Sequence, residues 1–122
     1  MAGELILIIE DNPLNLKMVD YLLTTKGYRV HTASDAKEAL HALITLQPDL
    51  ILMDLQLPGM DGFELTRKLK SEDKYQDIPI IAITAYAMKG DKEKALAAGC
   101  NGYIAKPIDT KTLPDIIAEY LS

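Results

Sequence analysis

The stretch LILMDLQLPGMDG, residues 50–62, decides the fold, because a strand expected to be buried ends there in a carboxylate. Its first four residues are apolar, Asp54 follows them, and Pro58 and Gly59 begin a loop. An apolar run of this length between turn residues predicts a parallel strand covered on both faces. Asp54 is therefore expected at the carboxyl end of a central strand.

Three other apolar runs also end in residues that can take part in chemistry. Leu5–Ile9 lead into Glu10 and Asp11, Ile80–Ile83 lead into Thr84, and Tyr103–Ala105 lead into Lys106. The carboxyl ends of parallel strands lie along one edge of the sheet, and ligands bind at that edge. We expect three carboxylates, one hydroxyl and one ammonium group to converge there.

Helical patterns separate these runs, so the chain is predicted to alternate strand and helix five times in an α/β fold. Tyr28–Thr32 alternate between apolar and polar residues, which favours an edge strand with one solvated face. The remaining strands are more apolar. The order 2-1-3-4-5 therefore fits best, giving a doubly wound, flavodoxin-like (βα)5 sheet of five parallel strands.

Apolar spacing also predicts which side chains of the helices face the core. In the helix that begins near Pro13 these are Leu14, Met18, Val19, Leu22 and Leu23. In the helix over about residues 36–46 they are Ala36, Ala39, Leu40, Leu43 and Ile44. The last helix is expected to start after Thr112, which leaves Pro114 in its first turn.

Composition limits the classes of protein to consider. With 122 residues and 48% hydrophobic content, residues 1–122 are expected to form one domain. A net charge of −5 argues against a nucleic-acid-binding surface. No apolar stretch is long enough for a membrane span or signal peptide, so a soluble cytoplasmic protein without membrane contact is expected.

Cys100 is expected to pack rather than react, and His31 and His41 to lie on the surface.

The predicted convergence of Glu10, Asp11 and Asp54 implies a divalent cation. Three neighbouring carboxylates repel one another, whereas Lys106 supplies one positive charge and Mg²⁺ would supply two. We expect Asp11 and Asp54 as direct ligands, the backbone carbonyl of Gln56 as a third, and Glu10 through water. The alternative is that the acids merely cap helices, which accounts for neither Asp54 nor Lys106.

These residues carry a resemblance to a known family. Glu10–Asp11, Asp54, Thr84–Ala85 and Lys106–Pro107 together resemble the receiver domain of two-component response regulators, over essentially the whole chain. The resemblance implies that Asp54 accepts a phosphoryl group, with Mg²⁺, from a histidine kinase or a histidine phosphotransfer protein. It further implies that Thr84, Ala85 and Lys106 bind the phosphoryl group, and that the product hydrolyses without a separate enzyme.

The resemblance also assigns residues to switching and to the loops. Thr84 and Tyr103 correspond to the hydroxyl and the aromatic residue that move together when a receiver is phosphorylated. For Tyr103 the alternative is an ordinary half-buried strand residue. Lys106–Pro107 corresponds to a cis peptide bond of the family, and Gly62 to a loop glycine with a positive φ angle. For Gly62 the alternative is an ordinary flexible turn.

A downstream protein is expected to bind the face formed by the fourth helix, the fifth strand and the last helix. The residues expected there are Ala87, Met88, Lys89, Lys92, Lys94 and Ala95. The chain resembles both stand-alone receivers of the cell-cycle and chemotaxis type and receivers attached to hybrid sensor kinases. Its start at Met1 favours the stand-alone form.

Three other functions compete with this interpretation. A flavin-binding module would need a phosphate cradle of small residues after the first strand, where this chain has Glu10 and Asp11. A phosphatase with an aspartyl nucleophile would need an acid two residues after Asp54, where this chain has Gln56. A scaffold without phosphorylation would not need all of these positions to be filled.

Overall fold

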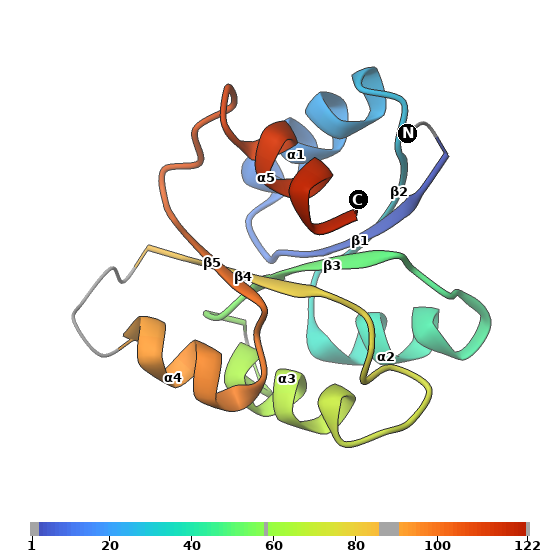
Figure 1. Cartoon of the computed structure of the whole chain (residues 1–122), viewed down its shortest axis with the longest axis vertical. Coiled ribbons are helices and arrows are strands. Elements are labelled where there is room, and N and C mark those ends of the chain that lie inside the picture. The colour runs from blue at the N-terminus through green and yellow to red at the C-terminus, as the bar shows by residue number, and fades with distance from the viewer. Residues whose placement is uncertain (1–2, 58, 86–90, 122) are drawn as a thin grey trace.

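A five-stranded parallel sheet forms the middle of the molecule, in a computed structural model that describes residues 3–57, 59–85 and 91–121 (Figure 1). The strands are β1 (Leu5–Ile9), β2 (Arg29–Ala33), β3 (Leu50–Asp54), β4 (Ile80–Thr84) and β5 (Gly102–Ala105). The helices are α1 (Pro13–Thr25), α2 (Ala36–Thr45), α3 (Gly62–Lys70), α4 (Asp91–Ala98) and α5 (Leu113–Leu121). The strand order is β2-β1-β3-β4-β5, which confirms the predicted α/β topology.

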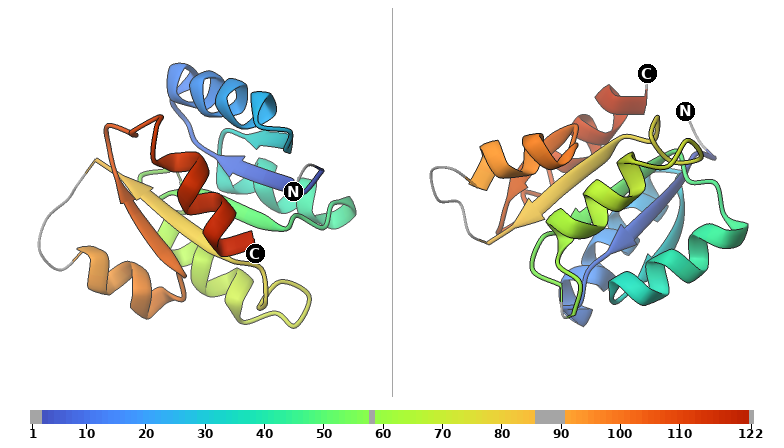
Figure 2. Two further views of the ribbon diagram at one scale, coloured as in Figure 1. Left: turned by 45° about the horizontal axis from the view of Figure 1, so that its top comes forward. Right: turned by 90° about the horizontal axis from the view of Figure 1, so that it is seen from below.

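The helices cover the sheet as two layers, with α1 and α5 on one face and α2, α3 and α4 on the other (Figures 1 and 2). Since side chains alternate across a strand, each central strand supplies both layers. Toward α1 and α5 the sheet presents Ile6, Ile8, Leu50, Leu52, Ile81 and Ile83. Toward the other three helices it presents Leu7, Ile9, Ile51, Met53, Ile80 and Ala82. The long apolar runs in the sequence are thus explained by burial on both faces.

The strand register aligns the ends of the strands at one edge of the sheet. Ile9 at the end of β1 pairs with Met53, the residue before Asp54. Asp54 in turn pairs with Ile83, and Thr84 pairs with Ala105. The residues at or just after the ends of β1, β3, β4 and β5 therefore meet at this edge, as the sequence predicted.

Local hydrogen bonds determine where several helices begin. Side-chain caps are made by Asn12 to the N–H groups of Leu14 and Asn15, by Asp35 to Glu38, and by Asp61 to Glu64. Each cap satisfies donors that have no partner inside the helix and stabilises it by about 1 kcal/mol. The last helix starts at Leu113, so Pro114 lies in its first turn, as predicted.

Two apolar side chains that were predicted to face the core lie in solvent instead. Leu14 is 78% exposed and Ile44 is 67% exposed. Leu14 belongs to the first turn of α1, beside Glu10 and Asp11 at the sheet edge, where the strands end and offer no core beneath it. Ile44 follows Leu43, and Leu43 already occupies the buried side of α2.

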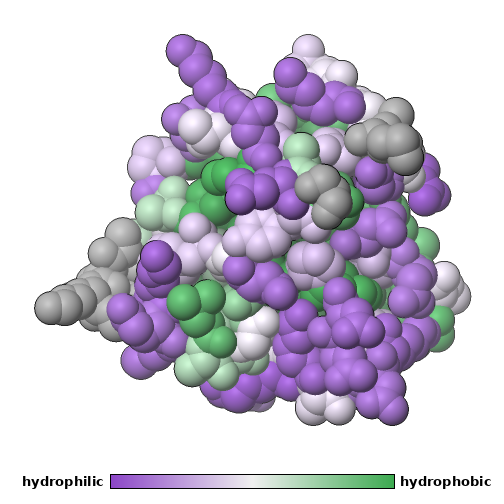
Figure 3. All heavy atoms as spheres, in the orientation of Figure 1, coloured by the Kyte–Doolittle hydropathy of each residue, from purple (hydrophilic) through white to green (hydrophobic). Residues whose placement is uncertain are grey.

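The visible surface is mainly hydrophilic, with a small hydrophobic group over α4 (Figure 3). Leu96 of α4 is 46% exposed. His31 and His41 are exposed, as predicted. Among the described residues, no helix is long and apolar enough to cross a membrane.

Candidate functional site: an acidic cluster at the carboxyl edge of the sheet

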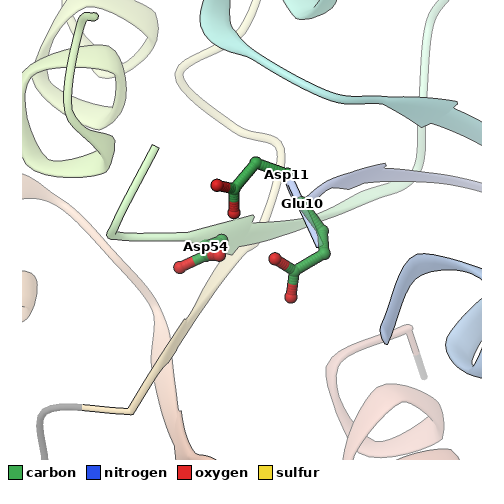
Figure 4. A group of neighbouring side chains, drawn as sticks. All are labelled: Glu10, Asp11 and Asp54. Carbon is green, nitrogen blue, oxygen red and sulfur yellow. The ribbon is translucent and has the colours of Figure 1, made fainter. Parts of the chain in front are cut away.

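Three carboxylates meet where β1 and β3 end. Glu10 and Asp11 follow β1, and Asp54 is the last residue of β3 (Figure 4). One oxygen atom from each of the three lies within 4.8 Å of the other two. We call these residues the acidic cluster. Glu10 and Asp54 are buried, whereas Asp11 is exposed, so the cluster is open to solvent on one side.

Lys106 reaches the acidic cluster from the end of β5. Its Nζ lies 2.9 Å from Glu10 Oε1 and 3.2 Å from Asp54 Oδ2. The lysine side chain is only 16% exposed. Burial lowers the pKa of Lys106, but the hydrogen bond and charge of Glu10 and the charge of Asp54 outweigh burial and raise this pKa above its ordinary value. Lys106 is therefore a permanent cation of the site.

One lysine does not neutralise the acidic cluster, and Glu10 shows the imbalance. Burial, together with the hydrogen bond to Asp54, raises the pKa of Glu10 to about 7. Burial also pushes the pKa of Asp54 upward, but hydrogen bonds from Glu10, the Gln56 N–H and Lys106 hold it below its ordinary value. Asp54 is thus the acid that stays ionised at neutral pH, whereas the raised pKa of Glu10 favours its protonated form.

The donor set of the acidic cluster fits Mg²⁺. Magnesium prefers oxygen ligands, uses one or two carboxylates and keeps several of its waters. The exposed Asp11 and the ionised Asp54 supply two such carboxylates, and the solvent at Asp11 leaves room for bound waters. The three carboxylates face a single lysine, so a divalent cation would supply the positive charge that Lys106 alone does not.

Gln56 connects the acidic cluster to the end of β4. Its backbone N–H donates to Asp54 Oδ1 at 2.9 Å, and its side-chain Oε1 accepts from the N–H of Ala85 at 3.1 Å. The sequence suggested only the backbone carbonyl of Gln56 as a metal ligand. The side-chain bond was missed, because sequence spacing does not indicate which rotamer a glutamine adopts.

Thr84 and Tyr103 lie on the strands beside the acidic cluster. Thr84 ends β4 and is 2% exposed, next to Ala85, which is exposed. Tyr103 lies on β5, opposite Ala82 of β4. It is half-buried against the core between the sheet and α2, α3 and α4. The structure thus places the hydroxyl, the ammonium group and the three carboxylates at one edge, and the tyrosine on the adjoining strand.

The loop glycine was predicted wrongly. Gly62 does not have a positive φ angle; Gly59 has one, with φ of 78°. Gly62 is instead the first residue of α3, where a Cβ atom would lie 2.6 Å from Leu55 Cα and 2.7 Å from the carbonyl oxygen of Asp54. The position therefore needs glycine for close packing against the backbone that carries Asp54. The Lys106–Pro107 peptide bond is cis.

The predicted output face is described only in part. Ala87, Met88 and Lys89 lie outside the described residues. Lys92 and Lys94 are exposed, in agreement with a surface role. Ala95 was placed there wrongly, since it is fully buried and packs against the core below the sheet. Leu96, at 46% exposed, is the large apolar side chain of the described part of α4 that reaches solvent.

Cys100 is a packing residue. It is buried, and its Sγ lies 3.7 Å from Thr66 Oγ1 on α3. Burial raises the pKa of the thiol, which keeps it in the unreactive protonated form.

Comparisons with known proteins show the family of the chain. The model of the response regulator receiver domain matches residues 6–118. The polar-differentiation response regulator DivK of Brucella anthropi is 44% identical over 116 residues, covering 95% of this chain and 94% of DivK. DivK of Brucella ovis is 43% identical over the same shares of both chains.

Solved structures agree as well. The receiver domain of sensor histidine kinase PA1611 from Pseudomonas aeruginosa is 39% identical, with a TM-score of 0.89 and 98% of each chain covered. That structure holds a magnesium ion in its active-site cleft. The chemotaxis response regulator CheY4 of Vibrio cholerae is 29% identical, with a TM-score of 0.92 over 98% of this chain and 100% of its own. This chain belongs to the response regulator receiver domain family.

Proposed function

We propose that Asp54 accepts a phosphoryl group from a phosphohistidine of a partner protein, with Mg²⁺ bound at the acidic cluster. One observation carries this proposal. Asp54 is 1% exposed, yet it stays ionised beside Lys106 and two further carboxylates at the open edge of the sheet. A buried carboxylate with a lowered pKa is a nucleophile that needs no base at neutral pH.

The transfer exchanges one bond to phosphorus for another. A carboxylate oxygen of Asp54 bonds to phosphorus while the bond from phosphorus to the donor imidazole nitrogen breaks, and the nitrogen keeps the electron pair. Lys106, 3.2 Å from Asp54 Oδ2, is positioned to neutralise the phosphoryl oxygens. Asp11, Asp54 and the Gln56 carbonyl, with Glu10 through water, would hold Mg²⁺, which would supply further positive charge for these oxygens. Thr84 and the Ala85 N–H would complete the set of groups that bind the phosphoryl group.

A groove beside Lys106 supports a protein as the phosphoryl donor. Its volume is about 390 Å³, and it is lined by Asn15, Met18, Ala85, Lys106, Pro107 and Ile108. Its lining comes from α1 and from the segments that follow β4 and β5, so a partner's side chain seated in it would lie beside Lys106. We propose a histidine kinase or a histidine phosphotransfer protein as that partner, in the cytoplasm, and no nucleic-acid partner for this acidic chain.

The same site supports an acceptor rather than a rapidly turning-over phosphatase. The position two residues after Asp54 holds Gln56, whose amide can neither protonate a leaving group nor activate water. Hydrolysis of the aspartyl phosphate is therefore proposed to be slow and intrinsic.

We further propose that residues 1–122 act as one domain, and that Thr84 and Tyr103 transmit phosphorylation to a downstream protein at α4, β5 and α5. Relatives include a response regulator and part of a sensor kinase, so both settings remain candidates.

Intact-mass spectrometry tests the proposal. The protein is incubated with Mg²⁺ and acetyl phosphate, and we expect one added phosphoryl group that is labile to base. Asp54→Ala should remain unmodified, whereas Asp73→Ala, at an exposed position in the turn after α3, should behave as the unchanged protein. Modification that persists in Asp54→Ala would refute the assignment. Release of phosphate over many rapid cycles would favour the phosphatase.

A further inference from the structure

Gln56 makes two hydrogen bonds that join the ends of two strands. Its N–H donates to Asp54 Oδ1 at 2.9 Å, and its Oε1 accepts from the N–H of Ala85 at 3.1 Å. Ala85 is the residue after β4, and Asp54 pairs with Ile83 of that strand. The Ala85 N–H therefore lies within the length of one glutamine side chain of the carboxylate proposed to be phosphorylated.

The two possible acceptors for the Ala85 N–H differ in strength. The Gln56 side chain offers a neutral amide oxygen, whereas a phosphoryl group on Asp54 would offer charged oxygens. Hydrogen bonds to ionised acceptors are shorter and roughly twice as strong as those between neutral groups. A phosphoryl oxygen within reach of this N–H would therefore displace the glutamine.

We propose that Gln56 is a positioning residue that holds the Ala85 N–H before phosphorylation and releases it to a phosphoryl oxygen afterwards. This inference rests on the proposed function of Asp54. It gives the Gln56 side chain a role separate from that of its backbone carbonyl. The glutamine keeps the end of β4 in its unphosphorylated position, and breaking its bond to Ala85 is part of the energetic cost of switching.

Two substitutions separate this role from simple space filling. Gln56→Met keeps the length of the side chain but removes the acceptor, whereas Gln56→Glu keeps an acceptor oxygen at the same reach. Gln47→Met is the matched control, since Gln47 is exposed and its Nε2 lies 3.5 Å from the carbonyl of Lys74. Two quantities are measured. The first is the rate of hydrogen exchange of the Ala85 amide, by NMR. The second is the concentration of beryllofluoride, a phosphoryl mimic, at which half of the protein is bound in the presence of Mg²⁺.

In Gln56→Met we expect the Ala85 amide to exchange about fivefold faster. This factor corresponds to the loss of one hydrogen bond with a net free energy of about 1 kcal/mol. Half-saturation should fall to an about fivefold lower beryllofluoride concentration, because no internal bond has to be broken. Gln56→Glu should restore slow exchange, and Gln47→Met should match the unchanged protein in both readouts. A side chain that only fills space would give normal exchange in Gln56→Met.

The outcomes separate this inference from the proposed function. Unchanged exchange in Gln56→Met overturns the inference, as does faster exchange with unchanged half-saturation. If either of these outcomes is found while the wild-type protein binds beryllofluoride, the proposed function stands. If it binds none, the proposed function fails and the role of Gln56 fails with it.

Discussion

Lys106, which follows the last strand, lies 2.9 Å from Glu10, which follows the first strand. The two residues are 96 positions apart in the chain and meet because parallel strands align their carboxyl ends. The ion pair brings one cation to a cluster of three carboxylates, and burial still keeps the pKa of Glu10 raised to about 7.

Removing the lysine should destabilise the fold at neutral pH. Lys106→Met leaves Glu10 and Asp54 without their shared cation, and breaking a buried ion pair is costly. We expect the free energy of unfolding to fall by about 2 kcal/mol. This is less than the usual loss on breaking a buried ion pair, because Glu10 can be neutralised by a proton. Urea denaturation at pH 7 measures this loss. Lys68→Met, at an exposed position of α3, is the control, and an equal loss in both variants would contradict the account.

Stability without divalent cations should fall as the pH rises from 4.5 to 7. The pKa of Glu10 is raised from 4.5 to about 7 by folding, so the folded state binds more protons than the unfolded state in that window. The expected fall is about 3 kcal/mol, and it should level off above pH 7. The lowered pKa of Asp54 acts in the opposite direction and only at lower pH, since its stabilisation is lost as the pH falls below 3.8.

Glu10→Gln provides the matched comparison for this pH dependence. Urea denaturation between pH 4.5 and 8 should show a much flatter profile in the variant, because the titrating group is gone. A variant profile as steep as that of the unchanged protein would assign the pH dependence to another residue.

Asp11 should affect magnesium binding and little else. It is exposed, so Asp11→Asn is expected to change the free energy of unfolding by less than about 0.5 kcal/mol without Mg²⁺. Loss of one charged ligand should weaken Mg²⁺ binding by about tenfold or more. Calorimetric titration with Mg²⁺ measures the affinity, with Asp73→Asn as the control. An unaltered affinity in Asp11→Asn would remove Asp11 from the metal site.

Gly59 in the loop and Gly62 at the start of α3 should respond differently to alanine. At Gly62 a Cβ atom would lie 2.6 Å from Leu55 Cα, a backbone atom that cannot move aside, so Gly62→Ala should cost about 3 kcal/mol. At Gly59 no atom lies within 4 Å of the added Cβ, and the positive φ angle alone should cost about 1 kcal/mol. Thermal or urea denaturation ranks the two variants. A larger loss at Gly59 would show that φ, not packing, governs this loop.

The sequence predicted the features of this fold that depend on periodicity. Uninterrupted apolar runs identified the buried strands, and the polar residue after each run located the acidic cluster and Lys106. Periodicity was less informative where an element leaves the core. Leu14 fits the apolar stripe of α1 but extends past the end of the sheet into solvent.

Contacts that depend on a single rotamer or on one close approach could not be predicted. The bond between Gln56 Oε1 and Ala85 has no signature in sequence spacing. The resemblance indicated that a glycine was needed at position 62, but not that close packing rather than backbone conformation required it. Likewise, Ala95 is compatible with either side of α4, and only the packing shows that it is buried.

The central claim is that Asp54 itself carries the phosphoryl group. Borohydride reduces an aspartyl phosphate to homoserine, so treatment of the phosphorylated protein marks the acceptor permanently. Peptide mass spectrometry should then find homoserine at position 54 and nowhere else in the chain. Homoserine at another aspartate, or none in a protein shown to be phosphorylated, would contradict the account.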